Sequence, residues 1–363
     1  MTSRPALFAS RLPGVSLYAT DETPCDLDLS DNTNLWGMPP VAASLAAARA
    51  VAASRYPTPY GGDLKIALAS YLGVDASMVV TGCGSDDVLD SAIRALAGPD
   101  DVIAFPTPTF SMIPVFATVS GLALAPILLN DDYTIDVDAL LATRARITYL
   151  CSPNNPTSTA IAYADVERIV AESYGVVILD EAYAEFSGVS HTALLARSER
   201  LVITRTMSKA FGLAGLRVGY GAASPVLAME IEKARGPYKV NAVAERAAVA
   251  VLGGRLEDGE SQIASPRSRA DPWVDETVRE AVEHRERLSA ELRAREFAVA
   301  PSAANFLFVP DAGAVAVAAA LRARSIAVRA FDALPVFGPA LRITVGPWPM
   351  MERLLAALDE IRP

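Results

Sequence analysis

Short apolar runs alternate with segments of helical spacing through the middle of the chain. In the segments Asp86–Leu96 and Tyr163–Glu172, apolar residues return at the intervals of an amphipathic helix. The apolar runs that we expect to be strands are Met78–Thr81, Asp101–Phe105, Ile147–Cys151, Val176–Leu179, Leu201–Thr204 and Val218–Gly221. Continuous apolar strands separated by helices are typical of a largely parallel sheet that is buried on both faces. The pattern therefore predicts an α/β fold.

The last third of the chain has a different order of elements. Gly253–Asp271 contains Gly-Gly, Asp-Gly and Ser-Pro pairs, which indicate an exposed loop. After it we expect a long helix at Trp273–Arg295, strands at Asn305–Val309, Ala327–Arg329 and Leu341–Val345, and helices at Gly313–Arg324 and Met350–Ile361. This order suits a smaller α+β domain.

The length of 363 residues exceeds what one small core needs and fits two packed domains. Residues 1–30 show little periodicity and resemble an arm. We therefore expect an N-terminal arm at residues 1–40, a large domain at 41–255 and a small C-terminal domain at 256–363.

Charge and composition exclude several classes of function. The net charge of −10 argues against nucleic acid or an anionic membrane as a partner. Three cysteines without a CxxC pair indicate reduced thiols, and two distant histidines argue against a zinc site. Met1–Val15 lacks the apolar core of a secretion signal, and no apolar run approaches the ~18 residues that span a membrane. We expect a cytoplasmic protein without a bound metal.

Polar residues gather just after the predicted strands. The five segments are Gly82–Asp86, Pro106–Phe110, Ser152–Thr157, Asp180–Tyr183 and Arg205–Lys209. In an open α/β sheet, ligands bind in the crevice beyond the carboxyl ends of the strands. Five separate segments therefore predict one binding site.

Some of these residues allow two interpretations each. Gly82–Asp86 suits an ordinary turn between strand and helix, or a turn whose free N–H groups bind an anion. It lacks the Gly-Lys-Ser/Thr ending of a Walker A loop. Asp180 is either a helix cap or a partly desolvated carboxylate that favours a cation, such as a pyridinium nitrogen. Tyr183 is either a core residue or a hydroxyl in the same crevice.

Lys209 stands between hydroxyl residues and a glycine-bearing turn. Most lysines lie on the surface, but a desolvated lysine amine is a nucleophile that captures carbonyl groups. Arg217 follows in Leu-Ala-Gly-Leu-Arg. Its guanidinium, with the hydroxyls of Thr206 and Ser208, can bind a phosphate.

Three motifs give the chain a family resemblance. Ser-Pro-Asn-Asn-Pro-Thr, Leu-Asp-Glu-Ala-Tyr and Thr-Met-Ser-Lys-Ala-Phe-Gly-Leu-Ala-Gly-Leu-Arg follow the order typical of fold-type I pyridoxal 5'-phosphate (PLP) aminotransferases. The details resemble histidinol-phosphate aminotransferases, from about Tyr18 to the C-terminus. One departure is Ser158, where the family usually has glycine. The resemblance implies a large domain with a mostly parallel seven-stranded sheet, a smaller α+β domain and PLP as cofactor.

The resemblance also implies roles for individual residues. Lys209 would carry PLP as a Schiff base and move the proton between the substrate α-carbon and the cofactor. Asp180 would hold the ring nitrogen protonated, Asn155 and Tyr183 would bind the phenolic oxygen, and Phe110 would stack on the ring. The residues implied around the phosphate are Gly84, Ser85, Asp86, Thr206, Ser208 and Arg217. Tyr56 resembles the tyrosine that reaches this phosphate from a neighbouring subunit, which implies a homodimer with shared active sites and an arm that contributes to it.

On the substrate side, the resemblance implies Arg342 and Arg329 as ligands of an acidic group, with Tyr18 from the arm. Asn32 and Asn34 match two positions of an Asn-Glu-Asn segment of the family, in which Thr33 replaces Glu. The predicted reaction converts L-histidinol phosphate and 2-oxoglutarate into imidazole acetol phosphate and glutamate. An aromatic or secondary-metabolite donor, or a lyase of the threonine-phosphate decarboxylase type, are the alternatives. A PLP-binding regulatory domain is disfavoured, because the sequence shows no basic DNA-binding extension. A Rossmann dehydrogenase is disfavoured as well, because no GxGxxG motif follows a predicted strand.

Overall fold

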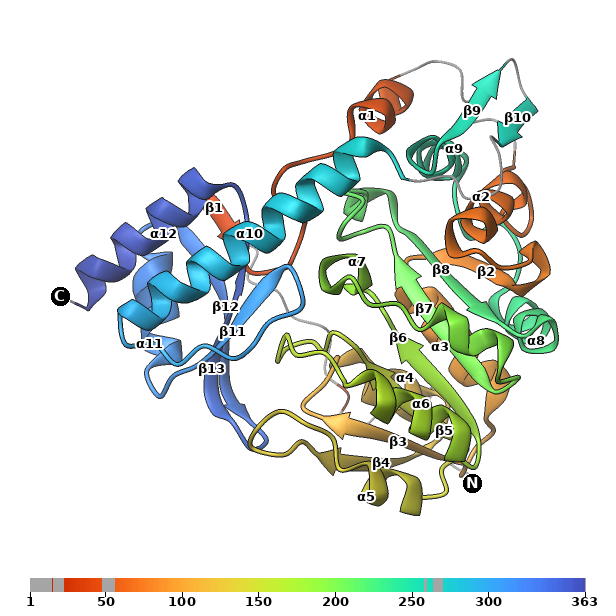
Figure 1. The fold of residues 1–363 in the computed structure, drawn as a ribbon, viewed down its shortest axis with the longest axis horizontal. Helices are drawn as coiled ribbons and strands as arrows, with labels where there is room; N and C mark the ends of the chain where they lie inside the picture. Colours follow the sequence, from red (N-terminus) through yellow and green to blue (C-terminus); the bar gives the residue numbers. More distant parts are fainter. Residues whose placement is uncertain (1–14, 16–22, 48–55, 258–259, 264–269, 363) are drawn as a thin grey trace, which may run out of the picture.

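Two β-sheets, each packed against helices, organise the chain (Figure 1). The computed structural model describes residue 15 and residues 23–47, 56–257, 260–263 and 270–362. The large sheet has seven strands in the order β2-β8-β7-β6-β5-β3-β4. These strands are β2 (Val79–Cys83), β3 (Val102–Thr107), β4 (Ala123–Leu128), β5 (Ile147–Cys151), β6 (Val176–Asp180), β7 (Leu201–Thr206) and β8 (Val218–Ala223). Only β8 runs antiparallel to its neighbours.

Helices cover both faces of the large sheet because successive strand residues point to opposite sides. Ile178 packs with residues of α3 (Ser85–Leu96), α4 (Met112–Val119) and α8 (Pro225–Arg235). Its neighbours Val177 and Leu179 pack on the other face with α5 (Val137–Ala142) and α6 (Tyr163–Glu172). The remaining elements of this part are α1 (Pro40–Ala47), α2 (Gly62–Leu72), α7 (Ala184–Ser187), α9 (Ala242–Val251) and the 3-10 turns η1 (Ala76–Met78), η2 (Thr192–Ala196) and η3 (Ala214–Leu216).

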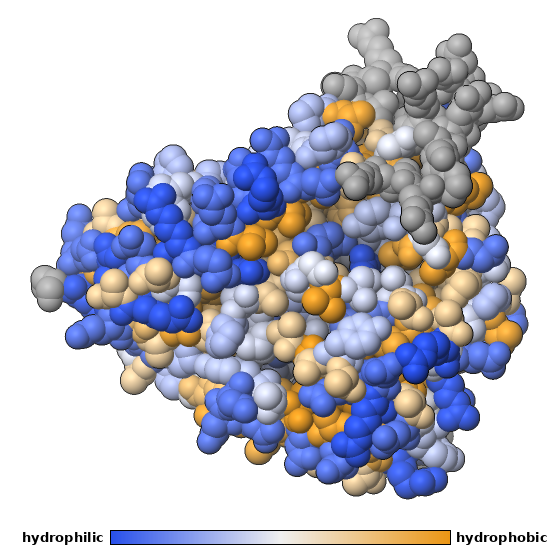
Figure 2. All heavy atoms as spheres, viewed as in Figure 1, coloured by the Kyte–Doolittle hydropathy of each residue, from blue (hydrophilic) through white to orange (hydrophobic). Residues whose placement is uncertain are grey.

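The small sheet joins the two ends of the chain. Its order is β1-β12-β13-β11, with β1 (Leu27–Leu29), β11 (Phe306–Pro310), β12 (Ile326–Leu334) and β13 (Gly338–Thr344). The helices α11 (Ala314–Arg322) and α12 (Trp348–Ile361) pack with it. The long α10 (Pro272–Ala294) runs from α1 and α9 towards this sheet (Figure 1). Mostly hydrophilic side chains cover its outer surface (Figure 2).

The predicted fold class is confirmed: a mostly parallel seven-stranded sheet accompanies a smaller α+β part. The pattern did not predict β4, because this edge strand is largely exposed and lacks a continuous buried run. The prediction of a loop throughout Gly253–Asp271 is wrong, because β9 (Gly254–Glu257) pairs with β10 (Glu260–Ile263). The Asp258-Gly259 pair between them is a typical hairpin signal.

A buried ion network lies beneath the end of β6. The Glu181 carboxylate is fully buried and accepts hydrogen bonds from the Arg205 guanidinium and from the backbone and Nδ1 of His191, the latter two at 2.8 Å. Burial favours the neutral acid, but the bonds from His191 and the charge of Arg205 hold the pKa of Glu181 below its usual value. Arg205 also contacts Glu185 at 3.3 Å.

Within the described residues, no helix is both long and apolar enough to cross a membrane.

We predict that Arg205→Ala lowers the free energy of unfolding by about 3–5 kcal/mol, because it leaves Glu181 as an uncompensated buried charge. Urea unfolding followed by circular dichroism measures the change. The matched control is Arg197→Ala, since Arg197 pairs with Glu167 at the exposed surface, where such a pair contributes about 0–1 kcal/mol. Equal effects of the two variants would contradict the prediction.

Candidate active site

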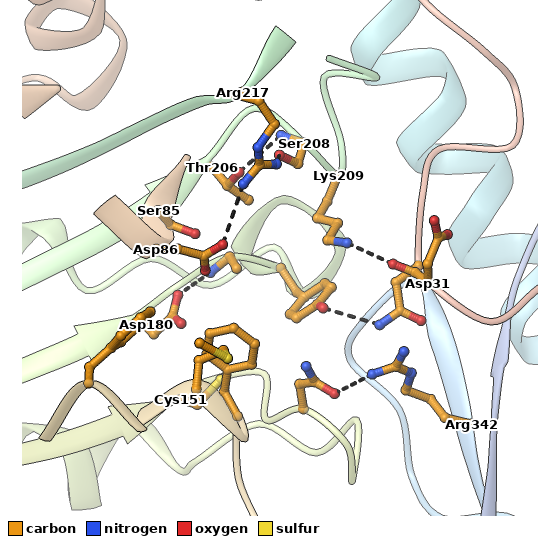
Figure 3. A pocket seen from close by; sticks show the side chains of 17 residues that line it. Asp31, Ser85, Asp86, Cys151, Asp180, Thr206, Ser208, Lys209, Arg217 and Arg342 are labelled. Carbon is orange, nitrogen blue, oxygen red and sulfur yellow. Dashed lines mark hydrogen bonds and ion pairs between the residues drawn. The ribbon is translucent and has the colours of Figure 1, made fainter. Parts of the chain in front are cut away.

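One cavity of about 440 Å³ lies beyond the carboxyl ends of the central strands, between the large and small sheets. Most of the side chains expected at the site line it (Figure 3). They are Ser85, Asp86, Phe110, Asn155, Asp180, Tyr183, Thr206, Ser208, Lys209, Arg217 and Arg342. The convergence that the strand ends predicted is therefore present.

At one end of the cavity, an arginine lies over the start of α3. Gly84, with φ 83°, caps this helix, and Ser85 begins it. The Arg217 guanidinium donates to the Ser208 hydroxyl at 3.4 Å and to the Asp86 carboxylate at 3.4 Å. Burial raises the pKa of Asp86, although the charge of Arg217 opposes this shift. Free N–H groups at a helix start, a hydroxyl and a guanidinium together suit a phosphate group.

Close backbone packing positions this end of the cavity. Gly219 in β8 lies against the backbone of Gly84 and Ser85, with no room there for a side chain. Gly84 itself lies against the guanidinium of Arg217. Glycine at both positions therefore lets the turn, the strand and the arginine approach one another.

If the cavity binds the PLP that the sequence resemblance implies, Gly219→Ala should weaken the affinity for PLP by roughly tenfold or more, because the new methyl group displaces the turn that begins α3. Titration of the apoenzyme with PLP, followed by tryptophan fluorescence, measures the affinity. Gly215→Ala is the control, since its methyl group would meet no atom within 4 Å. Unchanged affinity in Gly219→Ala would show that the turn does not need this close contact.

A buried carboxylate lies at the end of β6. Asp180 is 3% exposed and accepts hydrogen bonds from the Tyr149 hydroxyl at 3.0 Å and from the N–H of Ala182 at 3.1 Å. Burial raises the pKa of Asp180 to about 7, while the Tyr149 and Ala182 bonds oppose this rise. A cationic partner in the cavity would stabilise the charged form.

Removal of the Tyr149 hydroxyl should weaken PLP binding at neutral pH. Tyr149→Phe deletes a bond to the charged form of Asp180, so the pKa of Asp180 rises and the anion forms only at higher pH. A bond to a charged group is worth about 1.5–3 kcal/mol, so we expect roughly a tenfold loss of affinity or more. The pH dependence of apoenzyme titrations tests this, with the exposed Tyr163→Phe as control. An unshifted pH dependence in Tyr149→Phe would refute it.

The Lys209 amine faces the cavity from the turn after β7. It donates to the backbone carbonyl of Asp31 at 3.0 Å (Figure 3). Burial, and then the positive charge of Arg342, lower the pKa of Lys209 to about 8. A fraction of this amine is therefore neutral near pH 7, the form that attacks a carbonyl group.

Another arginine, Arg342 from β13, borders the cavity away from Arg217 (Figure 3). It donates to the amide oxygen of Asn155 at 2.7 Å and to the carbonyl of Ser30 at 2.6 Å. The Arg342 guanidinium thus connects the loop after β5 with the segment after β1. It brings positive charge to the wall formed by the small sheet.

The other expected site residues do not line the cavity, or lie outside the described residues. Gly84 lies just behind Arg217, and Asn34 donates to the carbonyl of Ala210 at 3.1 Å. Arg329 is directly opposite Arg342 in the β12–β13 pair, so both side chains lie on one face of the small sheet. Tyr56 is 84% exposed and stacks on Tyr238, with ring centroids 4.8 Å apart. Tyr18 is outside the described residues.

Several cavity residues were not predicted from the motifs. They are Asp31, Met112, Phe116, Cys151 and Ala182, whereas Asn32 was named only as a match to the Asn-Glu-Asn segment. Met112 and Phe116 lie one helical turn apart on α4, so they reach the cavity from one side. Their apolar spacing in the sequence is equally typical of a core helix, so it carried no signal of a binding role.

The chemistry of the lining fits a phosphorylated pyridine aldehyde. The cavity offers an amine of lowered pKa, a buried carboxylate and an arginine with hydroxyl groups, all from different strand ends. These groups would pair with an aldehyde, a ring nitrogen and a phosphate respectively. Each feature of the donor set thus has a counterpart in PLP.

Comparison with known proteins agrees with this chemistry. Residues 25–358 match the family described as aminotransferase class I and II. A histidinol-phosphate aminotransferase of Thermoanaerobacter sp. (strain X514) is 34% identical over 84% of each chain. Histidinol-phosphate aminotransferase 1 of Burkholderia pseudomallei (strain K96243) is 36% identical over 91% of each chain.

A solved structure resembles the whole chain. The histidinol-phosphate aminotransferase from Sinorhizobium meliloti, in complex with pyridoxal-5'-phosphate, has a TM-score of 0.81 and 24% sequence identity. The similarity covers 99% of the present chain and 98% of that chain. At this identity, the comparison bears on the fold.

Proposed function

The chain belongs to the aminotransferase class I and II family, and we propose that it transfers the amino group of L-histidinol phosphate to 2-oxoglutarate. It is a PLP-dependent aminotransferase that resembles histidinol-phosphate aminotransferases. The identity of the two substrates is the part proposed. The observation that carries it is one cavity lined by Lys209 and Asp180 together with two arginines, Arg217 next to β8 and Arg342 in β13.

We assign the cofactor contacts to residues that line this cavity. Bound PLP supplies an electron-withdrawing ring that makes the substrate α-carbon acidic. Asp180 would hold the ring nitrogen protonated, which is the charge state that its buried carboxylate favours. Asn155 and Tyr183 would bind the phenolic oxygen, and Phe110 would stack on the ring. Ser85, Asp86, Thr206, Ser208 and Arg217 would surround the phosphate, with Gly84 allowing the close approach.

Lys209 is the residue that we assign to proton transfer. Its amine has a pKa of about 8, so it can both take and give a proton near neutral pH. The Lys209 amine would accept the proton from the substrate α-carbon and deliver it to the C4' carbon of the cofactor. Burial of the amine supports this role, because it keeps a fraction of Lys209 neutral.

Arg342 and Arg329 are the proposed ligands of the acidic group of the substrate. Arg342 lies in the cavity, and Arg329 is its neighbour on the same face of the small sheet. A phosphate ester needs such a cluster of guanidinium groups, because they bind its oxygens in pairs. Tyr18 and Asn34 complete the proposed substrate contacts, as the family resemblance implies.

We further propose a homodimer with shared active sites. Tyr56 does not line the cavity of its own chain, and its stacking on Tyr238 presents two aromatic rings at the surface. Exposed aromatic rings of this kind are frequent in protein interfaces. In the proposed assembly, Tyr56 reaches the phosphate in the neighbouring subunit.

The proposed domains are the arm at 1–40, the large domain at 41–255 and the small domain at 256–363. The strands of the large sheet fall between Val79 and Ala223, and three of the four strands of the small sheet fall between Phe306 and Thr344. The pairing of β1 with β12 supports the idea that the arm contributes to the small domain.

A half-reaction screen tests the proposed substrates. When holoenzyme is mixed with L-histidinol phosphate alone, we expect the visible absorbance of the bound cofactor to fall, and 2-oxoglutarate to restore it. Phenylalanine lacks the phosphate that Arg342 would bind, so its kcat/KM should be roughly tenfold lower or more. Lys209→Ala is the negative control and should lose both the absorbance change and turnover.

Three results would contradict this assignment in different ways. A faster reaction with phenylalanine would replace the proposed donor by an aromatic amino acid. Release of carbon dioxide from threonine phosphate, without an oxo acid, would indicate a decarboxylase. Transamination by Lys209→Ala would remove the role assigned to that lysine.

A further inference from the structure

A buried asparagine borders the cavity from the segment that follows β1. Asn32 is 1% exposed and lines the cavity together with Tyr183. Its backbone has a φ of 59°, a left-handed conformation that asparagine adopts more readily than most residues. The carbonyl of Asn32 accepts a hydrogen bond from the Asn305 amide at 3.1 Å. The residue is thus held firmly in place by its backbone.

The side chain of Asn32 lies between the two sheets. Its Nδ2 donates to the hydroxyl oxygen of Tyr183 at 3.1 Å. Its Oδ1 accepts from the hydroxyl of Thr344, in β13, at 3.1 Å. The backbone N–H of Asn32 donates to the same Thr344 hydroxyl at 3.0 Å.

These bonds determine which way the amide of Asn32 points. The Thr344 hydroxyl oxygen already accepts the N–H of Asn32, so its own hydrogen must be donated. If the amide were reversed, Thr344 would receive two N–H groups and its hydrogen would need another acceptor. Thr344 is fully buried, where an unused donor is costly. The amide nitrogen therefore faces Tyr183.

The direction of the amide in turn sets the role of the Tyr183 hydroxyl. Since the Tyr183 oxygen accepts from Asn32, the hydroxyl hydrogen cannot point at the amide and is left to be donated elsewhere. Tyr183 is 4% exposed and lines the cavity. Burial raises the pKa of Tyr183, so the hydroxyl keeps its proton.

We propose that Asn32 is a positioning residue, which with Thr344 holds the Tyr183 hydroxyl as a hydrogen-bond donor directed into the cavity. The acceptor there is an anionic oxygen on an aromatic ring, namely the phenolic oxygen of PLP. The proposal rests on the contact between Tyr183 and this oxygen assigned under the proposed function. It adds that the segment after β1 and the small sheet together control the proton affinity of the ring oxygen.

The test is a double-mutant cycle on the pH midpoint of the visible absorbance of bound PLP. Tyr183→Phe removes a donor to an anionic oxygen, so the midpoint should rise by about one pH unit. Asn32→Asp should raise it as well, because the carboxylate would draw the Tyr183 hydrogen away from the ring and also adds negative charge. In the Tyr183→Phe background only the effect of the charge remains, so Asn32→Asp should cause a clearly smaller rise.

Two further variants separate positioning from loss of structure. Thr344→Val keeps the charge and shape of the site but removes the hydroxyl that orients the amide, so it should raise the midpoint less than Tyr183→Phe. Asn130→Asp places the same new charge at the exposed surface and should leave the midpoint unchanged. Thermal unfolding and the affinity of each apoenzyme for PLP show whether the variants are folded.

The outcomes distinguish this proposal from the one on which it rests. Equal shifts by Asn32→Asp in both backgrounds would show a charge effect alone and overturn the positioning role of Asn32. An unchanged midpoint in Thr344→Val, with a rise in Tyr183→Phe, would also overturn it. If Tyr183→Phe itself leaves the midpoint unchanged, the contact between Tyr183 and the ring falls together with the positioning role.

Discussion

The cavity depends on a carboxylate that is buried before any ligand pairs with it. Asp180 ends an apolar strand in the middle of the large sheet, where charge is costly. The neutral donors of Tyr149 and Ala182 offset only part of that cost, so the pKa of Asp180 stays near 7. A cation that enters the cavity can pair with the Asp180 carboxylate and stabilise its charged form, which the protein's own donors stabilise only in part. The buried Asp180 carboxylate can therefore favour the protonated form of a ring nitrogen in the cavity.

Two neighbouring carboxylates at the end of β6 have different electrostatic roles. Asp180 faces the cavity, whereas the next residue, Glu181, is enclosed by Arg205 and His191 beneath it. Glu181 directly follows the last residue of β6, so two adjacent residues serve the two roles. Glu181 accepts hydrogen bonds from both Arg205 and His191, and these bonds anchor the backbone next to Asp180. Precise placement of the carboxylate at the cavity follows from packing on the other side of the sheet.

Much of the large sheet could be predicted from sequence, because a buried parallel strand leaves a continuous apolar run. The run Ile147–Cys151 is β5 itself, whereas the exposed edge strand β4 has no such run and was missed. The motif residues around Lys209 were found because five strand ends must meet at one edge. The partners of Asn32 show what could not be found: the bonds that orient it come from Thr344 and Asn305, far away in the sequence. No local pattern records such a partnership.

The parallel pairing of β1 with β12 also constrains how the molecule is assembled. Leu27 lies opposite Ile326, so the small sheet contains one of the earliest described segments beside one of the latest. Such long-range pairing carries a large loop-closure cost and forms slowly compared with local contacts. During synthesis on the ribosome, the large sheet can form before β12, the partner strand of β1, has been translated. The wall of the cavity that follows β1 is therefore completed late, and the cofactor pocket can be finished only once β12 and β13 have been translated.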